Sequence, residues 1–341
     1  MTPRSASADP PGVDSTALRE YLDRERPGMV DGPLCAELIV GGRSNLTYLV
    51  TDGRGSWVLR RPPLGHVLAT AHDMGREFRV MSALAGSAVP VPGTVLHCAD
   101  DAVLGAPFYL MDKVDGTVYR SAEQVAQLGP QQARELSSTL VDVLADLHAV
   151  DIDAVGLADF GRPDGYLERQ VRRWRGQWEK SRSREVPGID ELADRLAATV
   201  PQSREAAVLH GDYRLDNVVV GADGRIAAVL DWEMSTLGDP LADVGLLLVY
   251  WETLSAQAGV TASNGFLSGA EVREYYARRT GRDLSNVDWH VALGFYKLAV
   301  VAEGIYFRHT QGKTVGEGFE RFGGMVAALV DNGLGTLHTP T

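Results

Sequence analysis

The sequence predicts an α+β fold with two lobes: a small β-rich N-lobe that carries one main helix, and a larger α-helical C-lobe. Three observations predict it. The chain has 341 residues, which is long for a single small core. Short β-rich runs fill its first third. Apolar residues then recur at helical spacing, apart from a β-rich interlude at 206–230. We therefore divide the chain into a disordered lead-in at 1–14, an N-lobe at 15–112 and a C-lobe at 113–341.

The N-lobe elements follow one another closely. Residues 36–63 hold β-rich runs separated by glycine turns, and the last of these runs is a strand at 57–60. Residues 71–86 have apolar side chains at helical spacing and end in glycine, which predicts the main helix. A strand at 108–111 then leads into a polar hinge at 111–116.

The C-lobe is predicted to be helical on both sides of its β-rich interlude. The interlude parses as a loop, a strand, an Asp-Gly turn at 222–225 and a second strand, which is the pattern of a β-hairpin. The expected helices are 131–151, 165–185, 190–200, 240–252, 269–281, 289–309 and 322–333.

Composition excludes several classes of function. The formal net charge is −12, whereas nucleic-acid binding favours a basic face, so we expect no nucleic-acid partner. Cys35 and Cys98 form no C-x-x-C pair, which fits a reducing compartment without structural zinc. The first dozen residues lack the apolar stretch of a secretory signal. The longest apolar run noted, 244–251, is far shorter than the ~18 residues of a membrane span. We therefore expect a cytoplasmic protein with no membrane partner.

The stretch HGDYRLDN at 210–217 carries the chemistry. Asp212 and Asn217 precede the predicted hairpin, and Asp231 follows its second strand. Because a hairpin brings its two ends together, we expect Asn217 and Asp231 to lie side by side. An amide and a carboxylate offer the hard oxygen ligands that Mg²⁺ prefers. Asp212 would then be free to orient a substrate hydroxyl and accept its proton.

These motifs resemble the aminoglycoside-phosphotransferase family of kinase-fold enzymes. The resemblance rests on His210-Gly211-Asp212 with Asn217, on LDWE at 230–233 and on STLGDPLADVG after it, and it extends from about Leu38 to about Phe322. VLRRPP, AHDMGREFRVMSAL and GYLERQVRRW are most similar to the branch of kinase-like domains fused to some acyl-CoA dehydrogenases. The resemblance implies a two-lobed protein-kinase-like fold. It also implies ATP- and Mg²⁺-dependent transfer of the γ-phosphoryl group to a hydroxyl of a small molecule.

The resemblance also assigns roles, with Asp212 as the catalytic base and Asn217 and Asp231 as metal ligands. Arg60 stands where the family has lysine, and it would anchor phosphates and pair with Glu77. Gly41 and Gly42 would begin a loop that binds the β- and γ-phosphates of ATP. Val58 would cover the adenine, and backbone groups of the hinge would form hydrogen bonds with the adenine. The full set of expected nucleotide-binding residues is Gly41, Gly42, Ser44, Asn45, Val58, Arg60, Glu77, Met111, Asp112 and Val114.

The other polar residues have mainly structural interpretations. We expect His210 to pack the catalytic loop, and Asp216, Asp239 and Asp243 to brace loops. The remaining buried-type histidines, His148, His290 and His309, have no metal-ligand spacing. In the basic segment 166–185 most cations should face solvent, and some could meet an anionic acceptor such as a CoA or a carboxylate.

Three functions stay open from the sequence. The preferred one is a kinase for a hydroxyacyl or acyl-CoA-type metabolite. The first alternative is an aminoglycoside O-phosphotransferase that confers antibiotic resistance. The basic segment counts against it, because an aminoglycoside is a polycation and would favour acidic side chains there. The second alternative is a nucleotide-binding pseudokinase with a regulatory role, against which the complete set of Asp212, Asn217 and Asp231 counts.

Overall fold

The chain folds into two compact units, each described here by itself. The computed structural model describes residues 9–39, 45–64, 73–254, 259–261, 265–312 and 318–337. Unit 1 comprises the chain up to Thr117 together with Val219–Gly221 and Ala227–Glu233, and unit 2 comprises Val118–Val218, Ala222–Ile226 and the chain from Met234 onward. The division into lobes at residue 112 remains a prediction.

Unit 1 is built on a five-stranded sheet in the order β1-β2-β3-β5-β4, with antiparallel neighbours throughout. Its strands are β1 (Cys35–Leu38), β2 (Leu46–Thr51), β3 (Ser56–Arg61), β4 (Thr94–Cys98) and β5 (Phe108–Asp112). The helices are α1 (Ser15–Glu25), α2 (Met74–Leu84) and the single-turn α3 (Asp101–Leu104). The predicted strand at 57–60 and helix at 71–86 correspond to β3 and α2.

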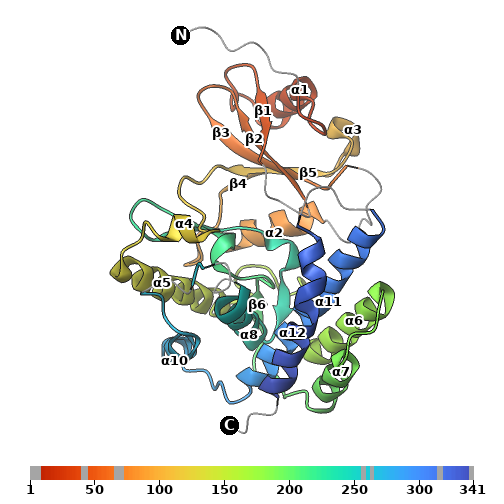
Figure 1. Cartoon of the computed structure of the whole chain (residues 1–341). Helices are drawn as coiled ribbons and strands as arrows, with labels where there is room; N and C mark the ends of the chain where they lie inside the picture. The colour runs from red at the N-terminus through yellow and green to blue at the C-terminus, as the bar shows by residue number, and fades with distance from the viewer. Residues whose placement is uncertain are drawn as a thin grey trace. The chain divides into compact units, whose positions relative to one another are not determined.

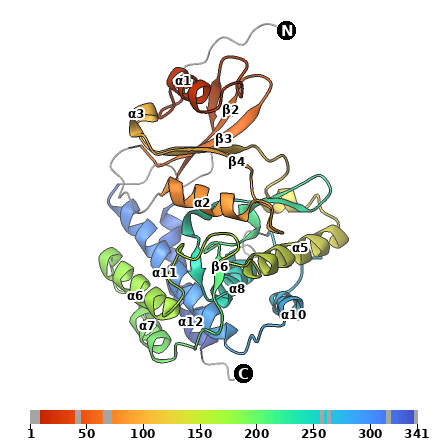
Figure 2. The same cartoon turned by 180° about the vertical axis from the view of Figure 1, so that it is seen from behind.

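The two main helices of unit 1 lie on opposite faces of this sheet (Figures 1 and 2). On the α1 face, Leu18 and Leu22 pack with Leu59 and Phe108 in a closed apolar core. On the other face, α2 packs against β4 and β5. Because side chains alternate along a strand, the neighbours of Leu59 on β3 point toward the α2 face.

Residues 9–14, which belong to the predicted N-terminal lead-in, make specific contacts with the rest of unit 1. Asp14 caps α1 by accepting hydrogen bonds from the amides of Thr16 and Ala17, and Val13 is buried. The buried Arg61 guanidinium donates to the carbonyl oxygens of Gly12 and Leu104. Buried backbone acceptors thus hold residues that composition alone assigned to a disordered segment.

The predicted hairpin is present. β7 (Val218–Val220) and β8 (Ile226–Val229) pair as a two-stranded sheet. Within unit 1, Val220 forms a bridge to Thr117, and the Val229 amide donates to the Pro90 carbonyl. These bonds join a late part of the chain to the N-terminal unit.

Unit 2 is mainly helical and has α11 at its centre, packed against α6, α7, α8 and α12. In both views, α5 and α10 lie on one side of α8, and α6 and α7 lie on the other (Figures 1 and 2). Its helices are α4 (Ala122–Val125), α5 (Pro130–His148), α6 (Tyr166–Ser181), α7 (Ile189–Ala198), α8 (Leu241–Val249), α10 (Gly269–Thr280), α11 (Val287–Thr310) and α12 (Glu320–Thr336). A short sheet pairs β6 (Ala207–Leu209) with β9 (Thr236–Gly238). The single turns are η1 (Leu215–Asn217), η2 (Trp232–Met234), which begins in unit 1, and the π-helical η3 (Tyr250–Leu254).

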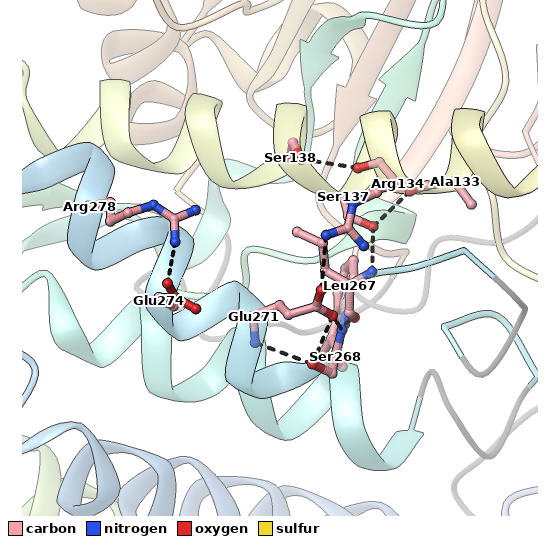
Figure 3. Close-up of polar contacts among 10 residues, drawn as sticks. Ala133, Arg134, Ser137, Ser138, Leu267, Ser268, Glu271, Glu274 and Arg278 are labelled. Carbon is pink, nitrogen blue, oxygen red and sulfur yellow. Dashed lines mark hydrogen bonds and ion pairs between the residues drawn. The ribbon is translucent and has the colours of Figure 1, made fainter.

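Polar contacts tie the start of α10 to α5, as Figure 3 shows. Ser268 and Glu271 form a capping box at the helix N-terminus, and Glu271 also pairs with Arg134 of α5 at 3.0 Å. The Leu267 amide donates to Ser137 Oγ at 3.2 Å. The chain before α10 is therefore fixed to a neighbouring helix.

Helix α11 is long and apolar enough to cross a membrane, which the sequence inspection missed when it named 244–251 as the longest apolar run. Its mean hydropathy reaches 1.2, but 72% of that window is buried inside the protein. The same composition is expected of the core helix of a folded domain.

Candidate active site

The chain after β6 forms a tightly braced loop in unit 2. The buried Asp243 of α8 accepts hydrogen bonds from the amides of His210, at 2.7 Å, and Gly211, at 2.9 Å. Gly211 has a φ of +81°, and a Cβ there would lie 2.6 Å from the Met234 carbonyl oxygen. Glycine is therefore required at this position. Asp243 braces the loop, in agreement with its predicted role.

Asp212 lies next in this loop, and several groups hold its carboxylate. The Tyr250 hydroxyl donates to Oδ1 at 2.7 Å, and the Asn217 amide donates to Oδ2 at 3.1 Å. Arg214 Nε lies 3.5 Å from Oδ2. The side chain keeps 23% of its surface exposed. The result is a fixed and accessible carboxylate, which is the geometry that a general base requires.

His210 has a structural place in this loop. It is fully buried, its ring packs edge-to-face with Tyr213, and Nδ1 accepts a hydrogen bond from the Asp212 amide at 3.2 Å. Asp216, also predicted as a brace, pairs with Arg214 at 3.1 Å.

Asn217 and Asp231 belong to different units, so their predicted pairing around a metal stays a prediction. Each offers an oxygen suited to a cation. The Asn217 amide nitrogen donates to Asp212, which leaves Oδ1 without a partner among the described residues. Asp231 uses Oδ1 for Arg60, and its Oδ2 makes no bond to the described part of the chain. These groups fit Mg²⁺, which takes few protein ligands and completes its shell with water and phosphate oxygens.

No group of three or more His, Cys, Asp or Glu side chains that could hold a metal is found in the described ranges.

A second cluster of charges lies in unit 1, on the α2 face of the sheet. Arg60 of β3 is 8% exposed, and its Nη2 lies 2.8 Å from Asp231 and 3.5 Å from Glu77 of α2. Glu77 is 1% exposed and accepts hydrogen bonds from Tyr109 and Asn45. The predicted pairing of Arg60 with Glu77 is therefore seen in the geometry.

The charges of this cluster perturb one another. Burial raises the pKa of Glu77, and the nearby positive charge of Arg60 opposes that rise. Burial alone would lower the pKa of Arg60, but Tyr109, Glu77 and Asp231 hold it above its ordinary value. Arg60 Nε is buried without a hydrogen-bond partner in the described part of the chain. A buried guanidinium with an unused donor is suited to an anionic ligand.

Asp231 has an unusual backbone, with a φ of +67°, the one positive value found for a non-glycine residue within the described ranges. Aspartate tolerates this left-handed region better than most residues do, and such strain gathers at functional sites. The next residue, Trp232, is buried and donates from its indole to the Val229 carbonyl. These contacts hold the turn that carries Asp231.

The other predicted nucleotide-binding residues have different outcomes. Gly41, Gly42 and Ser44 lie outside the described residues. Asn45 turns its amide toward Glu77 and Glu233, at 3.1 Å each, so that nitrogen is already used.

Val58 and Met111 pair across β3 and β5, and both are largely buried. The Asp112 amide donates to Gly93, whereas residues 113–115, which include Val114, make no backbone hydrogen bonds within the described ranges. The free backbone N–H and C=O groups after β5 are compatible with a hinge that forms hydrogen bonds with the adenine of a nucleotide.

Several residues of the site were not foreseen from the sequence. Tyr109 and Tyr250 carry no motif that marks them, and Glu233 lies in the LDWE motif without having been given a role. Lys297 does carry a signal, because it is a single cation in an apolar stretch of α11. Its ammonium group donates to the Gly211 carbonyl at 2.6 Å and lies 5.6 Å from the centre of the Trp174 ring.

Most cations of the basic segment are exposed, namely Arg172, Arg173, Lys180, Arg182 and Arg184. Three cations of the segment have acidic partners in unit 2: Arg175 pairs with Asp194, Arg182 with Asp190, and Arg184 with Glu303. Arg173 has no acidic partner within the described ranges and lies over the Trp174 ring. Most of this segment therefore matches the structural interpretation.

The fold and its two charge clusters define a phosphotransferase with a kinase-like architecture. The model of the phosphotransferase enzyme family matches residues 36–290, and the chain belongs to that family. A candidate aminoglycoside phosphotransferase from Ralstonia eutropha is 31% identical, with a TM-score of 0.83 over 95% of this chain and 98% of that one. Spectinomycin phosphotransferase, solved with ADP and spectinomycin, is 14% identical with a TM-score of 0.64 over 96% and 99% of the two chains, and shows the fold alone.

Curated relatives give a second comparison. Acyl-CoA dehydrogenase family member 11 from Gallus gallus is 34% identical over 336 residues, which is 94% of this chain. The chain spans 43% of that protein's length. The predicted family and the predicted kinase-like fold are both confirmed, and the family is one of phosphotransferase enzymes.

Proposed function

We propose that the protein transfers the γ-phosphoryl group of ATP to the hydroxyl of a small anionic molecule, with Asp212 as the general base. The observation that carries the proposal is the state of Asp212. Its carboxylate is partly exposed and is held at both oxygens, in a loop whose amides donate to Asp243.

In the reaction, a bond forms between the acceptor oxygen and the γ-phosphorus, and the bond from that phosphorus to the β–γ bridging oxygen breaks. The acceptor proton passes to a carboxylate oxygen of Asp212. General-base assistance of this kind contributes ~10²–10⁴-fold in rate.

Unit 1 contributes the nucleotide-binding groups in this proposal. Arg60 would anchor phosphate oxygens through its unused Nε, and Glu77 would hold the guanidinium in place. Val58, Met111, Asp112 and Val114 would surround the base, with the free backbone after β5 as its hydrogen-bonding edge. The ADP bound to spectinomycin phosphotransferase supports a nucleotide.

Mg²⁺ is the expected cofactor, and Asn217 and Asp231 would hold it through their uncommitted oxygens. When bound, Mg²⁺ neutralises the charge that develops on the transferred group.

The acceptor is proposed to be anionic, with a hydroxylated acyl or acyl-CoA-type molecule as the preferred class. The curated relatives, named as acyl-CoA dehydrogenase family members, support that class. So do three cations of unit 2. Lys297 and Arg173 have no acidic partners in the described part of the chain, and Arg214 lies 3.5 Å from the base itself.

An aminoglycoside acceptor is the second candidate, favoured by the overall likeness to antibiotic phosphotransferases. A polycation would meet like charge at Lys297 and Arg173. The third candidate, a regulatory pseudokinase, is disfavoured by the intact Asp212 carboxylate and its free hydrogen-bonding capacity. We place the enzyme in the cytoplasm, where the free thiols of Cys35 and Cys98 would stay reduced.

The test measures ADP release from MgATP with 3-hydroxybutyryl-CoA, free 3-hydroxybutyrate or kanamycin as acceptor, in wild type and Asp212→Asn. We expect turnover with an anionic acceptor, and a fall of ~10²–10⁴-fold in Asp212→Asn with ATP affinity retained. Turnover of kanamycin alone would establish the aminoglycoside alternative. Equal turnover by wild type and Asp212→Asn would remove Asp212 from the mechanism, and nucleotide binding without any turnover would favour the pseudokinase.

A further inference from the structure

Tyr250 makes the shortest contact to the Asp212 carboxylate. Its hydroxyl donates to Oδ1 at 2.7 Å, and its ring is 7% exposed. Burial, followed by the negative charge of Asp212, raises the pKa of Tyr250 well above its ordinary value. The phenol therefore stays protonated and acts as a permanent donor.

The other two contacts to the Asp212 carboxylate are both made by its second oxygen. Asn217 and Arg214 both approach Oδ2. A carboxylate oxygen has two lone pairs, so Oδ1 retains one after it accepts from Tyr250. Because both oxygens are held, the carboxylate cannot rotate, and the free lone pair of Oδ1 points in a fixed direction.

Arg214 holds the tyrosine ring as well. Its guanidinium carbon lies 4.7 Å from the centre of the Tyr250 ring, and the same side chain pairs with Asp212 and Asp216. One cation thus contacts the donor, the acceptor and a neighbouring acid. Cation–π contacts of partly desolvated groups contribute to such alignment.

The backbone under Tyr250 is specialised. Helix α8 ends at Val249, and the chain continues from Tyr250 as the π-helical turn η3, with the Tyr250 amide shared between the Leu246 and Leu247 carbonyls. Single π turns occur often at functional sites, because the wider turn redirects a side chain.

A chain of hydrogen bonds anchors this turn. The Trp251 indole donates to the Leu267 carbonyl at 2.7 Å, and the Leu267 amide donates to Ser137 Oγ at 3.2 Å. Ser137 in turn donates to the Ala133 carbonyl within α5, and the links from Leu267 to α5 are drawn in Figure 3. The turn that carries Tyr250 is therefore tied to a helix outside its own element.

We propose that Tyr250 is a positioning residue that holds the Asp212 carboxylate in its reactive orientation, from a π turn anchored to α5. The inference rests on the proposed role of Asp212 as the base. Tyr250 itself takes no proton in the reaction. Because its hydroxyl holds Oδ1, its loss should let the carboxylate rotate, which slows the transfer step without weakening the binding of either substrate.

The test compares kcat and KM of Tyr250→Phe with those of wild type, using MgATP and the acceptor with the highest turnover in the three-acceptor screen. The matched control is Tyr275→Phe, which removes a phenol that also donates to a carboxylate, that of Asp142, at 3.1 Å. For Tyr250→Phe we expect kcat to fall about tenfold, as for the loss of one charge-assisted hydrogen bond. KM for both substrates should stay within about twofold. The control should leave both kcat and KM at their wild-type values.

An isosteric replacement of Tyr250 by 3,5-difluorotyrosine guards against misfolding. Its phenol is a stronger donor, so kcat should stay within about twofold of wild type. A wild-type kcat in Tyr250→Phe, or a loss of kcat in the 3,5-difluorotyrosine variant as large as in Tyr250→Phe, overturns the inference, while an inactive Asp212→Asn leaves the proposed function standing. Full activity of Asp212→Asn overturns both.

Discussion

Lys297 shows how a single side chain can indicate an acceptor's charge. It is a partly buried cation whose hydrogen bond goes to a neutral carbonyl, that of Gly211, and no acid within the described ranges pairs with it. Burial lowers its pKa, and the positive charges of Arg173 and Arg214 lower it further, against the pull of Asp212 and Asp243. Holding such a charge in a protein is costly, and an incoming anion would relieve that cost.

Replacement of Lys297 by methionine should therefore raise KM for an anionic acceptor about tenfold, the equivalent of ~1.4 kcal/mol, with KM for ATP unchanged. In wild type, acceptor affinity should fall at alkaline pH through a midpoint below the ordinary lysine value, because the ammonium loses its proton early. Steady-state kinetics over pH 7 to 10 measure both effects. Lys180→Met, on the exposed last turn of α6, is the control, and an equal rise in KM there would refute a specific role for Lys297.

The sequence predicts residues well where a motif ties chemistry to spacing. Asp212, Arg60 and Glu77 were all foreseen, and each now has partners that fit its expected role, although those roles remain proposals. Tyr250 could not be foreseen, because its contact with Asp212 depends on a π turn and on a partner 38 positions away. Asn45 was predicted to donate to nucleotide phosphates, whereas its amide nitrogen donates to Glu77 and Glu233, and no spacing rule could reveal those contacts.

The crossing of α8 and α11 depends on one glycine. A Cβ at Gly245 would lie 2.5 Å from the His290 carbonyl carbon and 2.6 Å from its oxygen. Backbone meets backbone at this point, so no side chain can move aside. The same α8 carries Asp243, and the crossing therefore supports the helix that braces the catalytic loop.

Gly245→Ala should lower the free energy of unfolding by ~1–3 kcal/mol, the usual cost of overpacking a core. Gly176→Ala is the matched control, because nothing lies within 4 Å of its Cβ position on α6. There, alanine should leave stability unchanged or raise it by ~0.5–1 kcal/mol. Urea unfolding measures the free energy of unfolding of both variants. A Gly245→Ala protein as stable as the control would show that α8 and α11 can move apart at this contact without loss of stability.

Periodicity located the long helices because each buries one apolar face. It missed α1, which buries only Leu18 and Leu22 along an otherwise polar surface. It also missed β4, whose strand pattern is short and follows Pro90 and Pro92. Elements of this kind owe their form to tertiary contacts, such as the Arg61 bonds to Gly12 and Leu104, and no local window contains those contacts.

The stability of the protein toward acid depends in part on a buried histidine. His148 is 2% exposed, and its ring contacts Tyr276 at 2.7 Å and Asp243 at 3.5 Å. Burial lowers its pKa, and Asp243 opposes that shift. The unfolded chain therefore binds a proton more readily than the folded one, so stability is complete above the ordinary histidine pKa and is lost as the pH falls below it.

His148→Gln should flatten this dependence between about pH 7 and pH 5, the range set by the ordinary histidine value of ~6.5. Thermal melts at half-unit steps measure the slope of Tm against pH. His309→Gln, near the end of α11, serves as the comparison. A variant that keeps the wild-type slope would assign the acid sensitivity to other groups.

Unit 1 is discontinuous in the chain, with its last pieces at Val219–Gly221 and Ala227–Glu233. Arg60 and its partner Asp231 stand 171 positions apart. During synthesis, Arg60 and Glu77 therefore leave the ribosome well before Asp231, the second acid of the cluster. The nascent chain completes its first folding unit only after much of the second has left the ribosome, so a truncated product that stops at Thr117 contains the residues of all five strands but lacks the turn that completes the charge cluster.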